Sequence, residues 1–361
     1  MKEYKDLKNV LSNFNFDLDG EPYGSGLINR TYIVDSHPSY ILQRINTDIF
    51  TDPEGLMENI ANVTKFLRKK IIEEGGNPDR ETITIIPSKD GKSYYKAEED
   101  VYFRVYKFVE DSCFYDLPES PELLYNGAKA FGKFQRMLSD FPAQTLHETI
   151  PNFHNTRVRF EALKKAIHEN KAGRLDSVKD EIEFALSREY MVDIVLDGIK
   201  DGEIPLRVTH NDTKFNNVLL DKETKEGLCV IDLDTVMPGS LLYDYGDALR
   251  SGGSTGKEDE KDLSKISFNL VNYEYFTRGF LSELKDCMTE REKELIPFSI
   301  RLLTFECGIR FLTDYLNGDT YFKTVRPDQN LDRTRTQFKL VSDMESKDKV
   351  MNEILEKILA E

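Results

Sequence analysis

The chain has 361 residues, of which 39% are hydrophobic and 11% aromatic, so it is a folded globular protein long enough for two subdomains with separate cores. Its formal net charge of −16 repels nucleic-acid phosphates and anionic membranes, so neither is expected as a partner. The charge does not exclude a small phosphate ligand, because a metal ion and a few basic groups set the local field at such a site.

The sequence carries no recognisable signal for export, membrane insertion or cysteine chemistry. The first fourteen residues contain no long apolar segment of the secretory type, and no apolar run approaches bilayer-spanning length. The four cysteines form no C-x-x-C pair, which argues against a zinc site or a disulfide framework; they are Cys113, Cys229, Cys287 and Cys307. We therefore expect a cytoplasmic monomer with reduced thiols that acts on a small molecule.

The N-terminal part begins with an amphipathic segment and a glycine-containing loop. In residues 1–19, apolar side chains recur at helical spacing and predict a short helix. Residues 21–34 follow the pattern of strand, loop and strand, and Gly24, Ser25 and Gly26 form the loop. Two glycines one residue apart let backbone amides approach phosphate groups, but a plain hairpin turn explains the same residues. Both interpretations stay open on local grounds.

Further strands and one long helix are predicted before residue 110. We expect a strand over residues 40–45, a helix over about 54–74, and a hairpin formed by 82–86 and 92–95. Residues 102–109 form the last strand of this part. The boundary between two predicted lobes follows there, and the lobes are residues 1–109 and 110–361.

The rest of the chain is dominated by helical periodicity. Helices are expected from Pro121 to about residue 138, over roughly 263–284 and 291–316, and from about 331 to the end. Together with the strands, they predict an α+β protein in which a small N-terminal antiparallel sheet lobe precedes a larger, mainly helical C-terminal lobe.

The most informative stretch, from Leu206 to Arg250, contains short strands separated by polar loops. Apolar runs at 206–208, 218–220 and 228–231 predict the strands, and the turn segment KETKEG joins the second to the third. A tight turn makes these two strands antiparallel neighbours. The loops at the two ends of this hairpin are therefore brought towards one place.

Those two loops carry carboxylate and amide side chains at a specific spacing. His210-x-Asp212 is followed five residues after the Asp by Asn217, and Asp232 leaves the third strand. Protein kinases use the same arrangement, H-x-D-x-x-x-x-N and then a second Asp, to accept the proton of a hydroxyl and to hold Mg²⁺. Mg²⁺ prefers carboxylate, amide and phosphate oxygens as ligands. A polar loop with turn-forming Asn and Asp is the alternative, and it does not account for both loops at this spacing.

Three segments resemble the motifs of the aminoglycoside phosphotransferase and choline kinase superfamily: HND followed by NN, then VIDLDTVMPG, then LLYDYGD. Within that superfamily the chain is similar to the N-acetylhexosamine 1-kinases over nearly its full length, through segments such as PYGSGLINRTYIV, RVYKFVE, EDEKDLSK and ECGIRFLTDYLNGDTYF. The resemblance implies a bilobal protein-kinase-like fold, the use of ATP and Mg²⁺, and phosphorylation of the anomeric (C1) hydroxyl of N-acetylglucosamine or N-acetylgalactosamine.

The resemblance also implies roles for the motif residues. Asp212 would be the catalytic base that orients and deprotonates the acceptor hydroxyl. Asn217 and Asp232 would hold Mg²⁺. His210 and Asp244 would be structural, with Asp244 bracing the catalytic loop.

Nucleotide binding is expected in the N-terminal lobe. The glycine loop would cover the phosphates, and the end of the strand over 102–109 resembles the hinge whose backbone binds the adenine. The expected nucleotide-binding residues are Gly24, Ser25, Gly26, Gln43, Arg44, Lys107, Phe108 and Val109.

The third strand departs from the superfamily pattern. Protein kinases carry there a Lys that contacts the α- and β-phosphates, whereas this chain has Gln43 with Arg44 beside it. Adjacent strand residues point to opposite faces, so only one of the two can face a nucleotide. The residue that contacts the phosphates therefore stays open. The missing Lys also keeps open a nucleotide-binding pseudokinase, although the intact Asp212, Asn217 and Asp232 argue against it.

By the same resemblance, Asp234, Arg310 and Tyr321 would bind the acceptor. A carboxylate and a guanidinium suit the hydroxyls of a neutral sugar, and a tyrosine ring can pack on an apolar sugar face. Asp234 could also bind a second metal ion. The structural alternative pairs Arg310 with Glu306 and places Tyr321 in the core. An aminoglycoside, choline or homoserine stays an alternative acceptor, although Arg310 would repel a polycationic aminoglycoside.

Overall fold

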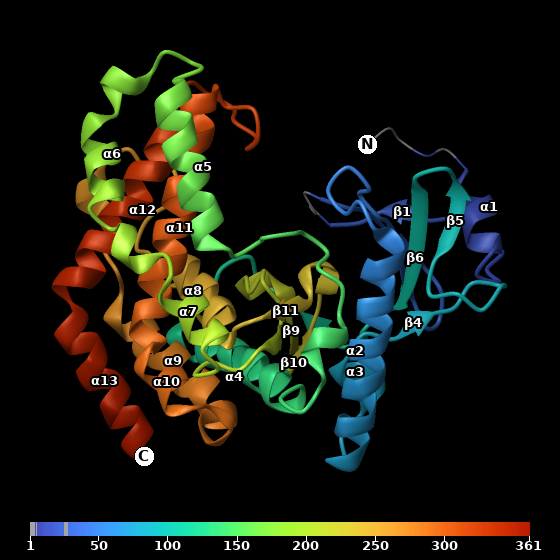
Figure 1. Ribbon diagram of the computed structural model, residues 1–361. Helices are drawn as coiled ribbons and strands as arrows, with labels where there is room; N and C mark the ends of the chain where they lie inside the picture. Colours follow the sequence, from blue (N-terminus) through green and yellow to red (C-terminus); the bar gives the residue numbers. More distant parts are fainter. Residues whose placement is uncertain (1–3, 5, 25–27) are drawn as a thin grey trace.

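The computed structural model describes residues 4, 6–24 and 28–361. A small lobe built on an antiparallel sheet lies beside a larger and mainly helical lobe (Figure 1). This arrangement confirms the predicted α+β class. None of the described helices is long and apolar enough to cross a membrane.

The small lobe is built on one antiparallel sheet with three helices. The strand order is β1-β2-β3-β6-β4, and β5 also pairs with β6. The elements are α1 (Leu7–Ser12), β1 (Glu21–Pro22), β2 (Arg30–Val34), β3 (Tyr40–Arg44), α2 (Pro53–Glu73), α3 (Pro78–Glu81), β4 (Ile85–Ile86), β5 (Tyr95–Glu98) and β6 (Val101–Lys107).

The predicted hairpin between residues 82–86 and 92–95 is wrong. Ile85 of β4 pairs with Tyr106, and Tyr95 of β5 pairs with Phe103, so both strands lie along β6. β6 is seven residues long, and its edge accommodates the two short strands one after the other. β4 and β5 therefore each pair with the longer strand β6 and not with one another.

The sheet has two different faces because successive side chains of a strand alternate. Phe103 and Val105 of β6 pack with Leu42 of β3 and with the apolar side of α1. Tyr102 and Tyr106 belong instead to the core that includes α2 and the large lobe. Odd-numbered residues of β6 thus face α1, and even-numbered residues face α2.

The two principal helices of the small lobe differ in how they begin and end. In α2, Asp52 accepts a hydrogen bond of 2.9 Å from the Gly55 N–H and Pro53 occupies the first turn, which are both favourable helix starts. The helix predicted over 54–74 is confirmed. Residues 1–3 and 5 of the helix predicted over 1–19 lie outside the described residues. The rest forms only the six residues of α1, which Asp6 caps at the start and which is followed by Asn15 in a left-handed conformation with φ 65°.

The chain leaves the first sheet after β6 and enters a second one. β7 (Ser112–Cys113) pairs with β9 (Val218–Asp221), which also forms the predicted hairpin with β10 (Gly227–Val230). β8 (Arg207–Thr209) pairs with β11 (Met237–Gly239) in a separate two-stranded ladder. These pairs hold both polar loops of the motif between short strands. The division into domains at residue 110 stays a prediction.

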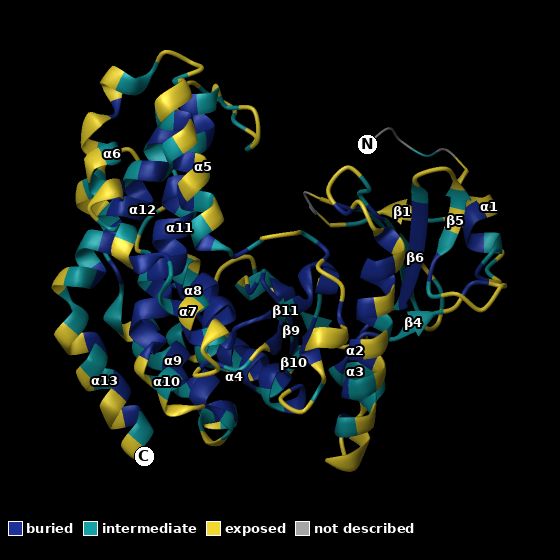
Figure 2. Cartoon of the chain, in the orientation of Figure 1, coloured by how far each residue is buried: buried dark blue, intermediate teal, exposed yellow. Residues whose placement is uncertain are grey.

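Helices form the rest of the large lobe. α11 is buried on most of its surface, whereas α6 and α13 expose outer faces (Figures 1 and 2). The single helix expected from residue 331 to the end is two helices, which meet at Lys347. The helices are α4 (Pro121–Met137), α5 (Thr156–Glu169), α6 (Lys179–Leu186), α7 (Ile194–Lys200), α8 (Leu241–Gly252), α9 (Leu270–Leu284), α10 (Glu290–Glu294), α11 (Ile296–Asn317), α12 (Gln329–Ser346) and α13 (Asp348–Ala360).

Candidate active site

The loop between β8 and β9 carries the predicted base and the predicted amide ligand. Asn217 is buried, and its Nδ2 donates to the Asp212 carbonyl at 2.8 Å and approaches the Asp212 carboxylate at 3.4 Å. The Nζ of Lys214 lies 2.7 Å from Asp212 Oδ1. An amide held through its nitrogen leaves its oxygen available to a cation, so this arrangement is compatible with the predicted metal role of Asn217.

Asp244 and His210 hold the backbone of this loop through hydrogen bonds. The buried Asp244 carboxylate accepts hydrogen bonds from the His210 N–H (2.9 Å) and the Asn211 N–H (2.7 Å), and burial raises the pKa of Asp244. The His210 Nδ1 accepts from the Asp212 N–H at 3.3 Å, so Nε2 carries the proton and donates to the Ile231 carbonyl at 2.8 Å. Both side chains therefore contact backbone, as expected of structural residues.

Asp232 follows β10 and faces the same loop. Its φ of 60° is left-handed, a conformation that Asp tolerates better than most residues. The side chain reaches solvent, yet the surrounding protein limits its hydration; this effect and then the carboxylates of Asp234 and Asp212 raise the pKa of Asp232 to about 6. Mutual repulsion of this kind is relieved by a bound cation.

These residues fit Mg²⁺ in the way that phosphotransfer sites hold it. Among the described residues, no three His, Cys, Asp or Glu side chains gather as a ready metal cage. Mg²⁺ commonly takes only one or two protein carboxylates and fills its other positions with water and substrate phosphates. Asp232 and the Asn217 amide oxygen can supply the protein ligands, and the roles of both stay predictions.

Asp234 lies in a different environment from that expected of an open substrate ligand. It is 3% exposed, and its two oxygens are contacted by two side chains of the small lobe. Asn29 Nδ2 donates to Oδ2 at 2.5 Å, and Arg104 Nη1 lies 2.5 Å from Oδ1. In this structure Asp234 therefore joins the two lobes, and its role in acceptor binding stays a prediction.

The two residues considered for phosphate contact on β3 point to opposite faces. Gln43 accepts from Arg104 and donates to Thr31 Oγ1 at 3.1 Å. Arg44 shares the face of Leu42, which packs on α1, and its charge acts on Tyr4 there. Arg44 is thus directed away from the α2 face, and its role in nucleotide binding stays a prediction.

The other residues expected to bind the nucleotide are only partly among those that the structure describes. Gly24 has φ 72°, and a Cβ added there would meet nothing within 4 Å, so the backbone is open at this position. Ser25 and Gly26 lie outside the described residues. In the expected hinge, the Phe108 N–H donates to the Ser39 carbonyl at 2.9 Å, and Val109 is buried.

Lys107 of the hinge is half-buried, and its Nζ lies 3.1 Å from Asp79 Oδ2. The side chain is therefore engaged by α3 in this structure. A hinge contact with adenine would use backbone groups, so this ion pair does not bear on it.

The predicted acceptor residues lie at α11 and just after it. The Arg310 guanidinium lies 5.8 Å from the ring centroid of Phe153 and 5.5 Å from that of Phe322. Tyr321 is 71% exposed, so the alternative that it is a core residue is wrong. Glu306 Oε1 lies 2.8 Å from His154 Nδ1, so this carboxylate has a partner other than Arg310.

Asp314 orders the loop that presents Tyr321. Its carboxylate accepts hydrogen bonds from the backbone N–H groups of Thr320 (2.9 Å), Tyr321 (2.8 Å) and Phe322 (2.9 Å). Asn330 Nδ2 donates to the same carboxylate at 2.8 Å. The exposed tyrosine is thus carried on a loop whose backbone is held by one buried side chain.

Asp314→Ala is expected to lower the free energy of unfolding by about 1–3 kcal/mol, because it leaves several N–H donors without an acceptor. Urea unfolding measures this change. Asp176→Ala, at a side chain that is 93% exposed, is the control and should have little effect. Equal stability of the two variants would contradict the role given to Asp314.

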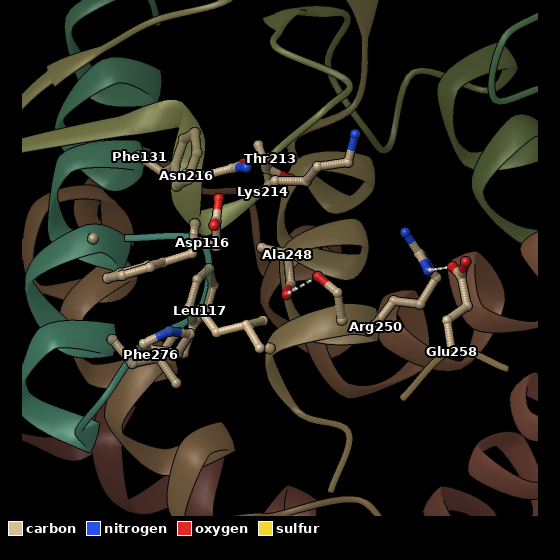
Figure 3. Close-up of a pocket in the computed structure, with 16 residues that line it drawn as sticks. Asp116, Leu117, Phe131, Thr213, Lys214, Asn216, Ala248, Arg250, Glu258 and Phe276 are labelled. Carbon is tan, nitrogen blue, oxygen red and sulfur yellow. Dashed lines mark hydrogen bonds and ion pairs between the residues drawn. The ribbon is translucent and has the colours of Figure 1, made fainter. Parts of the chain in front are cut away.

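A cavity of about 200 Å³ lies against residues 213–216, in the loop that carries Asp212. It is bounded by Asp116 and Leu117 after β7 and by Arg250 at the end of α8, and Arg250 points to Glu258 at 3.2 Å (Figure 3). None of the residues predicted from the sequence lines it. The cavity therefore lies beside the segment that follows Asp212.

Sequence reasoning missed Lys214, Arg104, Asn29 and Asp314. Lys214 stands within the motif, and its spacing from Asp212 was a usable signal. The other three act through partners that are distant in sequence, and no local pattern marks them.

Comparisons with known proteins agree with this geometry. A family model described as "Phosphotransferase enzyme family" matches residues 19–264. An aminoglycoside phosphotransferase from Alicyclobacillus acidocaldarius is 13% identical with a TM-score of 0.61, and 99% of this chain and 98% of that chain are covered. A spectinomycin phosphotransferase, solved with ADP and spectinomycin, is 14% identical with a TM-score of 0.59 and coverage of 95% and 97%.

A microcompartment-associated aminopropanol kinase is 13% identical, with a TM-score of 0.59 and coverage of 95% and 97%. Identities this low show a common fold and nothing finer. Arg310 and Tyr321 lie beyond residues 19–264, so the family match does not bear on them.

Proposed function

Because the chain belongs to the phosphotransferase enzyme family, we propose that it uses ATP and Mg²⁺ to phosphorylate the anomeric hydroxyl of an N-acetylhexosamine, giving the sugar 1-phosphate and ADP. Membership of the family supports the general part of this statement, that the protein is a phosphotransferase that acts on a small molecule. The acceptor and its reacting hydroxyl are the proposal.

The catalytic loop supports the chemical step. Asp212 accepts the proton of the sugar hydroxyl while that oxygen bonds to the γ-phosphorus and the bond to the β-phosphate oxygen breaks. Asn217 holds the Asp212 loop segment through its amide nitrogen. A bound Mg²⁺, held by Asn217 and Asp232, would neutralise charge on the phosphates.

The charges around Arg310 support a neutral acceptor, and this is the observation on which the acceptor proposal depends. Burial and then the nearby Arg310 lower the pKa of Arg159, while Glu306 acts in the opposite direction, so two guanidinium groups share this region with one buried carboxylate. A polycationic aminoglycoside or the quaternary ammonium of choline would be repelled there. Sugar hydroxyls and an N-acetyl carbonyl can accept hydrogen bonds from guanidinium groups, and Tyr321 offers an exposed ring.

Chemical assays on the products test both the acceptor and the position. A sugar phosphorylated at its anomeric oxygen is no longer reducing, whereas phosphorylation at O6 leaves a reducing end. N-acetylglucosamine or N-acetylgalactosamine is incubated with enzyme, ATP and Mg²⁺, and reducing ends and ADP are measured together. We expect one reducing end to be lost for each ADP formed.

Two results would contradict the proposal. ADP formed without a matching loss of reducing ends would exclude the anomeric hydroxyl. Turnover of kanamycin, choline or homoserine, with neither sugar active, would assign another acceptor. Homoserine is the most demanding control, because its carboxylate also suits two arginines.

A further inference from the structure

Arg104 is a buried cation that the proposed reaction does not yet use. It lies on β6 with 1% of its surface exposed, among the largest fully buried side chains of the protein. Burial alone lowers the pKa of Arg104, but Asp234, Tyr106 and Asp232 outweigh this effect and the pKa is raised, so the group is a permanent charge. A buried charge is tolerated only with partners close by.

The position of Arg104 corresponds to the place where the third strand lacks its lysine. Gln43 and Arg104 are direct partners across the β3–β6 ladder, so their side chains stand on the same face. Gln43 Oε1 accepts from Arg104 Nε at 3.0 Å and from Nη2 at 2.8 Å. The uncharged Gln43 on β3 thus orients the guanidinium group of Arg104 on the adjacent strand β6.

The guanidinium group of Arg104 faces the carboxylates that follow β10. Arg104 Nη1 contacts Asp234 Oδ1 at 2.5 Å, and the carboxylate of Asp232 also contributes to its pKa. Gln43 fixes one edge of the guanidinium, and Asp234 occupies only Nη1. An oxygen of another anion could take this place once the Asp234 side chain moves aside, while Gln43 still holds the Nε edge of the guanidinium.

We propose that Arg104 contacts the phosphates of the bound nucleotide in place of the strand lysine, and that Asp234 takes the position of a phosphate oxygen when no nucleotide is bound. The inference rests on the proposed ATP-dependent function and adds the residue that recognises the diphosphate part. Arginine suits this role because its fork of donors matches phosphate oxygens.

The nearby cations are less suited to the role. Arg44 lies on the face of β3 that packs against α1. Lys107 Nζ pairs with Asp79 on α3, at 3.1 Å. Lys214 belongs to the catalytic loop of the other lobe and pairs with Asp212 at 2.7 Å.

The competing explanation is that Arg104 and Asp234 form only a structural bridge between the lobes. The two explanations predict different ADP affinities for one substitution. If Asp234 competes with phosphate, Asp234→Asn frees Arg104 and metal-free ADP binds as tightly as in wild type or more tightly. If the pair is only a bridge, Asp234→Asn weakens ADP binding together with the fold.

The experiment is calorimetry of ADP and of adenosine in EDTA, which removes any contribution of metal. Arg104→Gln is introduced into Asp234→Asn, so that no unpaired buried carboxylate remains and the reference variant differs at Arg104 alone. We expect ADP to bind about 10- to 100-fold more weakly than to Asp234→Asn, the effect of losing charge-assisted hydrogen bonds. Adenosine, which has no phosphate, should bind both variants alike.

A charge-exchange variant supplies the rescue. Gln43→Lys combined with Arg104→Gln moves the cation across the ladder to β3 on the same face, and ADP affinity should return towards that of wild type. Thermal unfolding of each variant shows that it is folded under the conditions of binding.

Several outcomes would overturn the inference. Unchanged ADP affinity without Arg104, an equal loss of ADP and adenosine affinity, or weaker ADP binding in Asp234→Asn alone would each do so. These failures leave the proposed function standing if wild type phosphorylates the sugar. Failure of wild type to bind ADP or to turn over any acceptor would instead remove the proposed function.

Discussion

Asp212→Asn is expected to lower kcat by about 10²- to 10⁴-fold, the usual contribution of a positioned general base. The amide keeps the shape of the side chain but cannot accept the proton of the acceptor hydroxyl. It also loses the charge that now lies 2.7 Å from Lys214 Nζ. Steady-state ADP release, with the acceptor and ATP both varied, measures kcat and the two KM values.

The control for this prediction is Asp176→Asn, the same chemical change at a side chain that is 93% exposed. It should leave kcat within about twofold of wild type, since exposed substitutions rarely have large effects. The KM for the acceptor in Asp212→Asn should change much less than kcat. A kcat near that of wild type would remove Asp212 as the base.

Asp232→Ala is expected to abolish the gain in ATP affinity that Mg²⁺ produces and to lower kcat by about 10²-fold or more. Asn217 would remain as a ligand, but an amide carries no charge to offset that of the ion. Calorimetry with ATP in the presence and absence of Mg²⁺ separates the two effects.

Without metal, the sign of the effect should differ. The carboxylate of Asp232 repels the phosphates of ATP, so its removal should leave metal-free ATP affinity unchanged or make it tighter. Equal dependence on Mg²⁺ in Asp232→Ala and wild type would contradict the assignment of this carboxylate. Reduced ATP affinity in both conditions would show that the substitution disturbs the nucleotide site itself.

Local sequence was sufficient to predict the elements that form from neighbours in the chain. α2 follows from its apolar spacing, and Asp52 and Pro53 mark its start. The β9–β10 hairpin follows from two apolar runs around a turn, and it brings the Asp212 loop and Asp232 together. These features depend on separations of a few residues, where periodicity and turn chemistry act directly.

The resemblance to a superfamily predicted more of the fold than the periodicity of apolar residues did. It implied the small sheet lobe and the larger helical lobe, and the structure and the family match over residues 19–264 confirm them. The resemblance did not supply the pairing of β4 and β5 with β6, because that depends on which strand edge is free once the sheet has formed.

Tertiary structure alone decided the partners of the charged groups. The sequence left Gln43 and Arg44 as alternatives for phosphate contact. In the structure, Arg44 lies on the face of β3 that packs against α1. Arg104 meets Asp234 across 130 positions of sequence, and Asn29 meets the same carboxylate across 205. No local pattern carries such a pairing, since it arises only when two lobes pack and each buried charge must find a counter-charge.

The residues predicted to bind the acceptor show the same difference between what the sequence and the tertiary structure provide. The sequence placed Arg310 on a helix and named Tyr321, but the exposure of Tyr321 and the Asp314 carboxylate that holds its loop appear only in three dimensions. Spacing along the chain determined which groups are available for phosphoryl transfer. Packing between the lobes determined which of their charges face one another, because Coulomb interactions depend on distance in space and not on distance in sequence.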